Sequence, residues 1–314
     1  MKTIFDVNTT QIEEGVARIS YSQYAMYSRC PKQWELCYVK KHKVSEPNIN
    51  LTFGSAFHET LQTWLDTVFN KSIKLASQMN LPNLLQTNMM RIYKEEMDKF
   101  GQHYSSPAEL AEYYEDGVAI LEHITKKRSA YFPSKGYKLI GIEMPLNIRV
   151  REDYPKVRLI GFMDLVIYNE NSDTYTIYDI KTSYMGWKDN AKKDKTKTSQ
   201  LVLYKEYFSR QWNLNPDKVE IEFFIVKRKI LQESVFPQKR VQEFTPASGS
   251  VTRKKLVKSI EQFVADCFSP DGSYNVDREY PAIAGPANVN CKYCEFKDKP
   301  DLCPAKSRIK VLLS

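Results

Sequence analysis

The segment 157–182 constrains the fold most strongly, because it is typical of two strands joined by a turn. Residues 157–168 are rich in β-branched, aliphatic and aromatic side chains, and residues 174–182 have the same character. The stretch between them, 169–173, reads Asn-Glu-Asn-Ser-Asp and has the composition of a turn. A hairpin centred on that turn pairs residues whose numbers add up to 343.

That register brings two acidic side chains together. Asp164 lies opposite Asp179, with Cβ atoms roughly 5 Å apart, and Lys181 projects from the same face of its strand as Asp179. Opposed like charges destabilise a strand pair unless a cation compensates them. A divalent metal held by carboxylates would do so, leaving the lysine free to meet an anionic substrate. The pattern favours metal-assisted phosphodiester cleavage, although strand-end aspartates that are simply solvated would give the same residues.

The rest of the chain alternates between helical and strand-like patterns. One central mixed sheet flanked by helices is therefore expected, an α/β (α+β) fold. We expect a single domain, 1–314, with a helical insertion at about 75–132. Pro31 indicates that the first helix is interrupted. The expected helices are about 20–38, 59–74, 81–100, 108–131, 199–212 and 250–268, and the expected strands are 138–150, 156–168, 174–182, 218–227 and 233–244.

Composition narrows the class of protein. The formal net charge of +8 and the pI near 8.9 favour an anionic partner. No apolar run approaches a membrane span, and the N-terminal residues lack the apolar core of a signal peptide. A soluble cytoplasmic protein without membrane contact is expected. The chain also has no G-x-x-x-x-G-K-[ST] loop, so it carries no recognisable nucleotide motor.

Several further residues could support chemistry. His58 follows a Gly-Ser-Ala turn at an expected helix start, where an imidazole could bind metal, although a lone histidine is more often structural. Glu143 could be another carboxylate near the metal, but an edge residue is the favoured interpretation. Gln200 and Tyr204 lie four apart on one helical face, where they could contact Lys181, a water or a phosphate.

A basic loop follows the second strand of the hairpin. Residues 188–197 contain five lysines and two aspartates, and aromatic side chains stand just before them. Cations interleaved with flat rings suit single-stranded nucleic acid, whereas most charge runs are solvated loops. The position of the loop directly after the aspartates and lysine favours nucleic-acid contact. The candidate residues are Tyr184, Trp187, Lys192, Lys193, Lys195 and Lys197.

The cysteines indicate a metal centre rather than disulfides. Cys291, Cys294 and Cys303 stand close together, and an iron–sulfur cluster or a closed zinc site needs a fourth thiolate. Cys30 is the preferred fourth ligand because a proline follows it, as one follows Cys303. The segment 285–306 would then pair with Cys30 and join the two ends of the chain. Cys37 and Cys267 are interpreted as ordinary buried thiols.

Taken in order, these motifs resemble the RecB-type nucleases of the PD-(D/E)xK superfamily. The resemblance is closest to the iron–sulfur subgroup that includes AddB and CRISPR-associated exonucleases, and it spans 20–304. One departure is the spacing of eight residues between the last two cysteines, where five are frequent. The motifs are Cys30, Gly54-x-x-x-His58, Gly161-Phe-Met-Asp164, Asp179-Ile-Lys181, Gln200-x-x-x-Tyr204 and Cys291-x-x-Cys294 with Cys303.

The resemblance implies a restriction-endonuclease-like fold and a specific ligand set. His58, Asp164, Asp179 and the Ile180 carbonyl would bind Mg²⁺ or Mn²⁺, and Lys181 would position the attacking water or the scissile phosphate. Gln200 and Tyr204 would support the site, and the cysteines would bind a [4Fe–4S] cluster, with Zn²⁺ as the alternative.

These implications point to a DNA exonuclease acting on single strands or free ends. Its setting would be recombination, repair or phage DNA processing in a bacterial cytoplasm, with a helicase or recombination partner. Two rivals remain: a non-catalytic DNA-binding module of the same fold, and a zinc-stabilised RNA-binding protein. The first leaves the histidine, both aspartates and the lysine without a purpose, and the second leaves the hairpin carboxylates unexplained.

Overall fold

The computed structural model describes residues 15–42, 46–231, 236 and 238–310. The chain divides into two compact units, and each is built from segments that are distant in the sequence. The described part of the first unit comprises 46–144, 162–231, 236 and 238–247, and that of the second comprises segments within 8–45, 145–161 and 248–314.

A mixed sheet forms the centre of the first unit. Strand β3 pairs with β2 on one side and antiparallel with β4 on the other. Strands β4 and β5 are parallel, and β6 is antiparallel to β5. Strands β2 and β3 continue into the second unit. The strand bounds are β2 Tyr137–Arg149, β3 Val157–Asn169, β4 Thr174–Ser183, β5 Val219–Lys227 and β6 Val241–Phe244.

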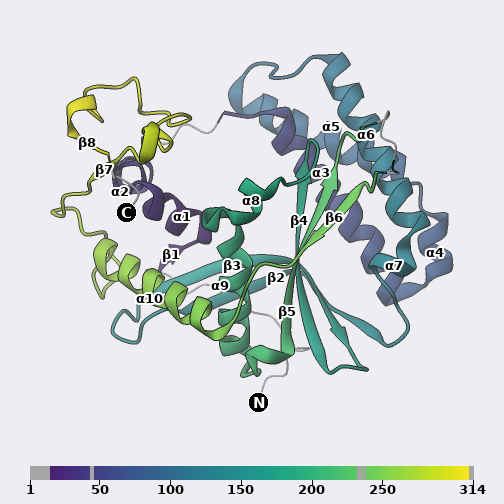
Figure 1. The fold of residues 1–314 in the computed structure, drawn as a ribbon. Helices are drawn as coiled ribbons and strands as arrows, with labels where there is room; N and C mark the ends of the chain where they lie inside the picture. The colour runs from purple at the N-terminus through teal and green to yellow at the C-terminus, as the bar shows by residue number, and fades with distance from the viewer. Residues whose placement is uncertain (1–14, 43–45, 232–235, 237, 311–314) are drawn as a thin grey trace. The chain divides into compact units, whose positions relative to one another are not determined.

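Helices pack on one face of this sheet (Figure 1). Their apolar side chains, including Phe53, Phe57 and Leu85, form one core with Leu165, Ile180 and other inward-facing strand residues. This burial of apolar area is the main force that holds helices to the sheet. The elements are α3 Ile49–Asp66, the π-helical turn η2 Thr67–Lys71, α4 Ile73–Gln78, α5 Leu81–Phe100, α6 Pro107–Lys126 and α7 Arg128–Tyr131.

Helix α3 begins earlier than the sequence predicts. The Asn48 side chain accepts a hydrogen bond from the Leu51 N–H and caps the helix. Residues 54–58 therefore lie inside a long helix and do not form a turn before one. The prediction that His58 stands at a helix start is wrong, because Asn48 provides a stronger start signal than the small residues Gly54, Ser55 and Ala56.

The crossover between the parallel strands β4 and β5 is formed by α8 Asp189–Lys193, α9 Lys195–Trp212 and the 3₁₀ turn η3 Pro216–Lys218. Helix α9 begins where the Asp194 side chain accepts a hydrogen bond from the Thr196 N–H. It ends at Asn213, which takes the left-handed conformation common at helix ends. Helix α9 buries Leu201, Tyr204 and Phe208, and the Phe208 ring contacts Tyr175 of β4.

The second unit is largely helical. Pro31 divides its first helical segment as expected, since α1 ends at Arg29 and α2 begins at Pro31. The Trp34 ring contacts Phe263 of α10, Tyr27 and Phe268 in an aromatic core. The elements are β1 Ala17–Ile19, parallel to the start of β3, then α1 Tyr21–Arg29, α2 Pro31–Trp34, η1 Glu35–Val39, α10 Ser250–Cys267, β7 Ala282–Ile283, η4 Pro286–Asn288, η5 Ala305–Ser307 and β8 Arg308–Ile309.

Some sequence predictions fall partly or wholly outside the described residues. The expected strand 233–244 includes undescribed positions, and its described part forms β6 only from Val241. The N-terminal residues examined for a signal peptide are also undescribed. Among the described residues, every helix is too short or too polar to cross a lipid bilayer.

Candidate active site

The β3–β4 hairpin has the register predicted from its turn. The pairs run from Leu165 with Tyr178 to Asn169 with Thr174, and the numbers in every pair add up to 343. The regular pairing ends there, and Asp164 and Asp179 are the next residues of the two strands. The two carboxylates are therefore brought to the same end of the strand pair.

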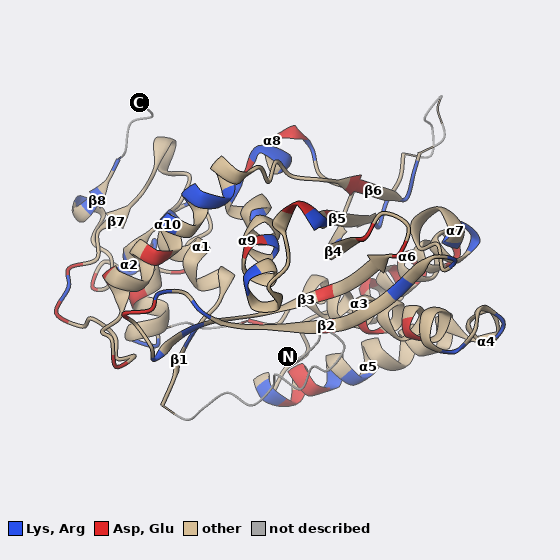
Figure 2. Ribbon diagram, turned by 90° about the horizontal axis from the view of Figure 1, so that it is seen from below, with Lys and Arg blue, Asp and Glu red and all other residues tan. Residues whose placement is uncertain are grey.

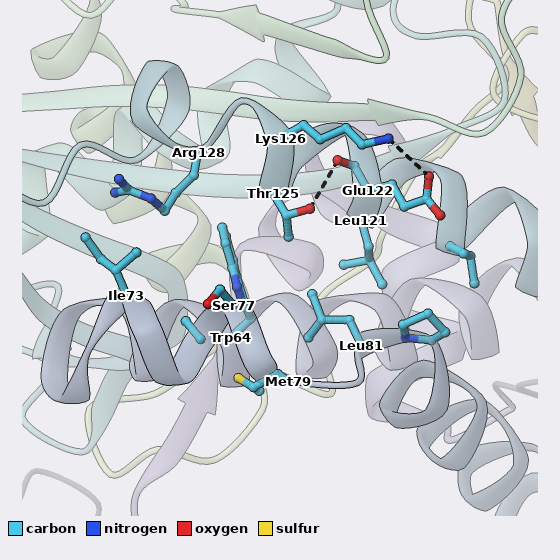
Figure 3. Close-up of a pocket in the computed structure, with 13 residues that line it drawn as sticks. Trp64, Ile73, Ser77, Met79, Leu81, Leu121, Glu122, Thr125, Lys126 and Arg128 are labelled. Carbon is cyan, nitrogen blue, oxygen red and sulfur yellow. Dashed lines mark hydrogen bonds and ion pairs between the residues drawn. The ribbon is translucent and has the colours of Figure 1, made fainter.

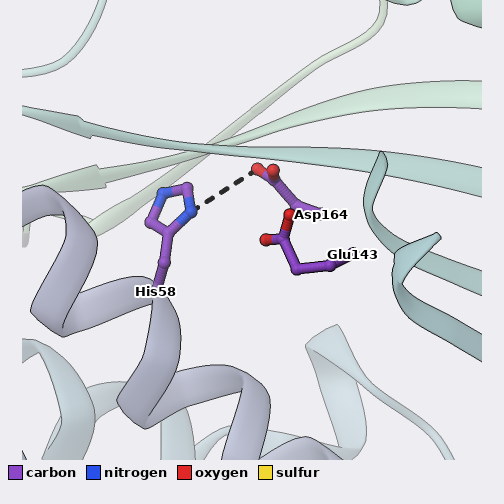
Figure 4. A group of neighbouring side chains, drawn as sticks. All are labelled: His58, Glu143 and Asp164. Atoms are coloured by element: carbon purple, nitrogen blue, oxygen red, sulfur yellow. Dashed lines mark ion pairs between the residues drawn. The ribbon is translucent and has the colours of Figure 1, made fainter. Parts of the chain in front are cut away.

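Asp164 is tied to the neighbouring strand through its side chain. Its Oδ2 accepts a hydrogen bond of 2.7 Å from the Ile180 backbone N–H. The same oxygen lies 3.7 Å from Nδ1 of His58, which reaches the site from α3 (Figure 4). One carboxylate thus joins β3, β4 and a helix.

Asp179 and Lys181 project from the same face of β4, as their spacing predicts. The Lys181 Nζ lies 2.7 Å from Asp179 Oδ2. Asp179 is only 3% exposed, so its charge is removed from water and the lysine is its immediate compensation.

The position of His58 depends on a close approach of α3 to β4. Gly54 lies one helical turn before His58, and a Cβ atom on it would be 3.4 Å from Oγ1 of Thr182. A larger side chain would displace the helix from the strand that carries Asp179 and Lys181. This glycine therefore contributes to the site through packing.

Glu143 lies beside His58 and Asp164, which supports the less favoured of its two interpretations. Ligand atoms of His58, Glu143 and Asp164 all lie within 4.8 Å of one another (Figure 4). Glu143 has a φ of 47°, a conformation that interrupts the regular alternation of β2. An alternation pattern therefore cannot tell which way this side chain points, which is why the sequence did not favour it as a metal ligand.

Gln62 connects the Glu143 side chain to the Asp164 backbone, and it was not identified from the sequence. Its Nε2 donates to Oε1 of Glu143 at 2.7 Å and to the backbone carbonyl of Asp164 at 3.1 Å. Gln62 is buried and lies one helical turn after His58. The spacing of four residues on α3 was the available signal.

Burial sets the protonation of the site. It raises the pKa of Asp164 and of Asp179 to about 6, although the Lys181 charge acts in the opposite direction. Burial lowers the pKa of His58, and the Lys181 charge lowers it further. Burial disfavours the charge of Lys181, but Asp179 and Asp164 outweigh this effect and raise its pKa. A neutral imidazole beside clustered carboxylates suits a divalent cation.

Gln200 and Tyr204 interact with each other on α9. The Gln200 Nε2 donates to Oη of Tyr204 at 3.2 Å. Burial raises the pKa of Tyr204, and the charges of Asp179 and Lys181 also act on it. The Tyr204 hydroxyl is therefore a neutral group in the field of the site.

The basic loop is anchored to the sheet at one tryptophan. Gln242 accepts from the Trp187 N–H at 2.7 Å and donates to its carbonyl at 3.1 Å. The Trp187 ring packs against Phe223 and Phe244, so it stabilises the loop. Tyr184, in contrast, is 58% exposed.

Four of the five lysines of this loop lie on α8 and at the start of α9, and Lys188 caps α8 (Figure 2). Lys192 and Lys193 are on α8, and the Lys192 Nζ lies 5.8 Å from the centre of the Phe244 ring. Lys195 and Lys197 fall in the first turn of α9.

The structure brings Cys30 together with Cys291, Cys294 and Cys303 around one small cavity in the second unit. The Cys30 Sγ accepts a hydrogen bond from the Ile283 N–H at 3.4 Å. Burial raises the pKa of the Cys291 and Cys294 thiols, although the Arg308 charge opposes this effect at Cys291.

The other two cysteines lie outside this group. The Cys37 Sγ donates to Oε1 of Glu295 at 3.3 Å. Cys267 is buried in α10, and burial raises the pKa of its thiol.

A separate pocket of about 390 Å³ lies in the first unit among α3, α4, α5 and α6 (Figure 3). Its wall includes Trp64, Leu81 and Leu121, with Glu122 and Lys126 3.6 Å apart at its edge. Its lining residues are distinct from the predicted site residues, so it adds nothing to the chemistry described above.

Carboxylates and a lysine on a hairpin of a mixed sheet, with an imidazole from a neighbouring helix, suit metal-assisted phosphodiester cleavage. The family model of the PD-(D/E)XK nuclease superfamily matches residues 18–303, and the chain belongs to that superfamily. The mixed α/β architecture agrees with the restriction-endonuclease-like fold expected from the motifs. No curated protein matches the chain at a significant level.

Proposed function

We propose that the protein is a DNA exonuclease that degrades single strands or free ends with Mg²⁺ or Mn²⁺. The observation that carries the proposal is the convergence of His58, Glu143 and Asp164 within 4.8 Å, beside the Asp179–Lys181 pair. Membership of a nuclease superfamily supports phosphodiester cleavage as the reaction.

The residues present fit a hard divalent cation. His58, Glu143 and Asp164 would hold it, and the family resemblance adds Asp179 and the Ile180 carbonyl as ligands. Burial raises the pKa of both aspartates, so a bound cation would stabilise their charged forms. Mg²⁺ and Mn²⁺ also prefer oxygen ligands. A bound ion would supply Lewis acidity and a water molecule of lowered pKa.

The chain's own residues would orient the reaction. The Lys181 ammonium would attract a phosphate oxygen and offset the charge that develops on the phosphorus group. Asp179, 2.7 Å from Lys181, would keep the ammonium at that position. Gln62 would keep Glu143 and the Asp164 backbone in place through its two hydrogen bonds. Tyr204 and Gln200 would support the site from α9.

DNA is the proposed substrate because the chain has a net charge of +8 and a basic loop directly after β4. Lys192, Lys193, Lys195 and Lys197 would contact phosphates. The absence of a P-loop motif from the sequence favours a partner helicase or recombination protein that supplies ends. We place this activity in recombination, repair or phage DNA processing in a bacterial cytoplasm.

We also infer a metal centre at Cys30, Cys291, Cys294 and Cys303. Their common cavity and the N–H donated to the Cys30 sulfur fit thiolate ligation. The resemblance to iron–sulfur nucleases favours a [4Fe–4S] cluster, and zinc is the alternative. The centre would connect residues near the two ends of the chain and so stabilise the second unit.

Cleavage of linear and circular DNA tests the proposed function. Single-stranded DNA of one sequence is prepared in both forms and incubated with Mg²⁺ or Mn²⁺. Loss of the linear form to mononucleotides or short products, with the circle intact, is expected. Labels at the 5′ or 3′ end then report polarity. Equal loss of the circle would reject end-directed action, and no loss of either form would reject the nuclease function.

A further inference from the structure

Tyr184 exposes its ring directly beyond β4. The ring is 58% exposed, yet its backbone is held firmly. The Lys229 N–H donates to the Tyr184 carbonyl at 2.8 Å, and the Arg228 N–H donates to the Ser183 carbonyl at 2.9 Å. These bonds continue the pairing of β4 with β5, so the backbone of Tyr184 is fixed relative to Lys181. Tyr184 lies three positions after Lys181, about 10 Å along the strand. Strand alternation turns its side chain to the other face, where Arg228 and Tyr113 of α6 lie.

A buried guanidinium lies beneath this ring. The Arg228 Cζ is 5.6 Å from the centre of the Tyr184 ring and 3.4 Å from the centre of the Tyr113 ring. Arg228 is 7% exposed. Planar guanidinium groups stack well on aromatic faces, and the attraction is stronger where water is excluded. The guanidinium and the two rings form the Tyr113–Arg228–Tyr184 stack.

The charge of Arg228 is balanced locally. Its Nη1 lies 3.3 Å from Oδ2 of Asp116, which is itself buried. The other Asp116 oxygen accepts from Nζ of Lys229 at 2.9 Å, and the same Nζ lies 2.9 Å from Oε1 of Glu112. This ion-pair network fixes the guanidinium in one place.

The inner end of the stack is anchored to the core. The Tyr113 hydroxyl donates to Oδ1 of Asn50 at 2.8 Å. The Tyr113 ring meets Phe53 edge-on with centroids 5.5 Å apart, and Phe53 contacts Phe57 at 5.8 Å. Planar groups therefore continue from the helical core to the exposed Tyr184 ring. A ring supported in this way loses little conformational entropy when a ligand stacks on it.

We propose that Tyr184 is a stacking platform for an unpaired base of a bound nucleic-acid strand. The inference rests on the proposed nuclease function and specifies its substrate as a strand with accessible base faces. In a duplex those faces are covered by neighbouring base pairs, whereas a single strand can turn them toward an aromatic side chain. The stack would favour single strands and frayed ends for this reason.

Binding without cleavage tests the platform separately from the chemistry. The full-length protein is titrated in EDTA against a labelled oligothymidylate and an abasic strand of the same length. Base stacking contributes about 1–3 kcal/mol, so Tyr184→Ala should raise the Kd for oligothymidylate roughly 5- to 150-fold. The abasic strand should bind the wild type more weakly and should lose little further affinity in Tyr184→Ala.

Matched variants separate stacking from general damage. Tyr184→Phe keeps the ring and should retain affinity for oligothymidylate, and Met185→Ala removes an exposed neighbour and should also retain it. Arg228→Lys keeps the charge but not the planar group, so it should weaken only the binding of the strand that has bases. An equal effect of Tyr184→Ala on both strands, or none on either, would overturn the proposal. Base-dependent binding without cleavage would uphold the platform while rejecting the nuclease function.

Discussion

The Asp164 carboxylate accepts a 2.7 Å hydrogen bond from the Ile180 backbone N–H. A side chain on one strand thereby replaces a regular link to the next strand at the position where the site begins. The peptide that donates to Asp164 lies between Asp179 and Lys181, so the two strands cannot shift without separating these groups. The register of the hairpin therefore fixes the relative positions of Asp164, Asp179 and Lys181.

The metal-free protein should become less stable as the pH rises through about 6. Burial raises the folded-state pKa of Asp164 and Asp179 from 3.8 to about 6. Protons bound more tightly by the folded state stabilise it fully below pH 3.8, and this contribution is lost as the pH passes 6. The loss should be at most about 3 kcal/mol for each aspartate.

Urea unfolding in EDTA between pH 4 and 8 measures this effect. Asp164→Asn and Asp179→Asn should flatten the stability profile relative to the wild type, and Mn²⁺ should restore the stability of the wild type above pH 6. Parallel profiles for the wild type and both variants would show that these carboxylates do not carry the pH dependence.

Two glycines on neighbouring helices should respond oppositely to alanine. A Cβ on Gly54 would meet Thr182 Oγ1 at an ordinary contact distance of 3.4 Å. A Cβ on Gly117 would lie 2.5 Å from Leu85 Cδ2 and 2.9 Å from Phe53 Cε2. Gly54→Ala should leave stability unchanged or raise it by about 1 kcal/mol, whereas Gly117→Ala should lower it by about 1–3 kcal/mol.

Thermal melts and cleavage rates compare these variants. Gly54→Leu should also reduce cleavage, since it pushes α3 and His58 away from β4, and Thr182→Ala should partly restore it. Full activity of Gly54→Leu would mean that the close approach of α3 to β4 has no part in the chemistry.

Removing the loop lysines should change the salt dependence of DNA binding. Replacing Lys192, Lys193, Lys195 and Lys197 with alanine removes phosphate contacts and releases fewer counterions. The slope of log K against log salt should become shallower, while turnover at saturating DNA should change little. A control of equal charge replaces the exposed residues Lys71, Lys74, Lys126 and Lys127. If both quadruple variants give the same slope, the loop is only a solvated connection.

The cysteines should divide into two groups by their effect on bound metal. Cys30→Ser should lower metal content and melting temperature, because Cys30 shares its cavity with Cys291, Cys294 and Cys303. Cys37→Ser should change neither the metal content nor the melting temperature, since the Cys37 thiol donates a hydrogen bond to Glu295 instead. Anaerobically purified protein should absorb near ~400 nm, as thiolate-bound iron–sulfur clusters do. Colourless protein with one zinc per chain would select zinc, and protein without metal would reject the centre.

Site residues on regular backbone could be predicted from the sequence. The turn composition of 169–173 sets the hairpin register, and the strand period of two places Asp179 and Lys181 on one face. These two local rules were sufficient to predict the centre of the site from sequence. They depend on neighbouring residues and require no knowledge of tertiary packing.

The groups that sequence reasoning missed or did not favour depend on irregular backbone or distant contacts. Glu143 points into the site because its backbone adopts a φ of 47°. Gln62 has a role only once α3 lies against β3. Arg228 supports the Tyr184 ring through contacts with Tyr113 and Tyr184, and both tyrosines are distant from Arg228 in the sequence.

Metal-dependent cleavage by one set of side chains is the central claim, and a matched rate measurement tests it most directly. Release of labelled nucleotides from linear single-stranded DNA is followed with Mn²⁺, with Mg²⁺ and with EDTA. The wild type, Asp164→Asn, Lys181→Met and the double variant are compared, with Met185→Ala as the control. Each single site variant should lose about 10²- to 10⁴-fold in rate, and the double variant should lose little more. Cleavage by the wild type in EDTA, or a near wild-type rate in either single site variant, would contradict the account.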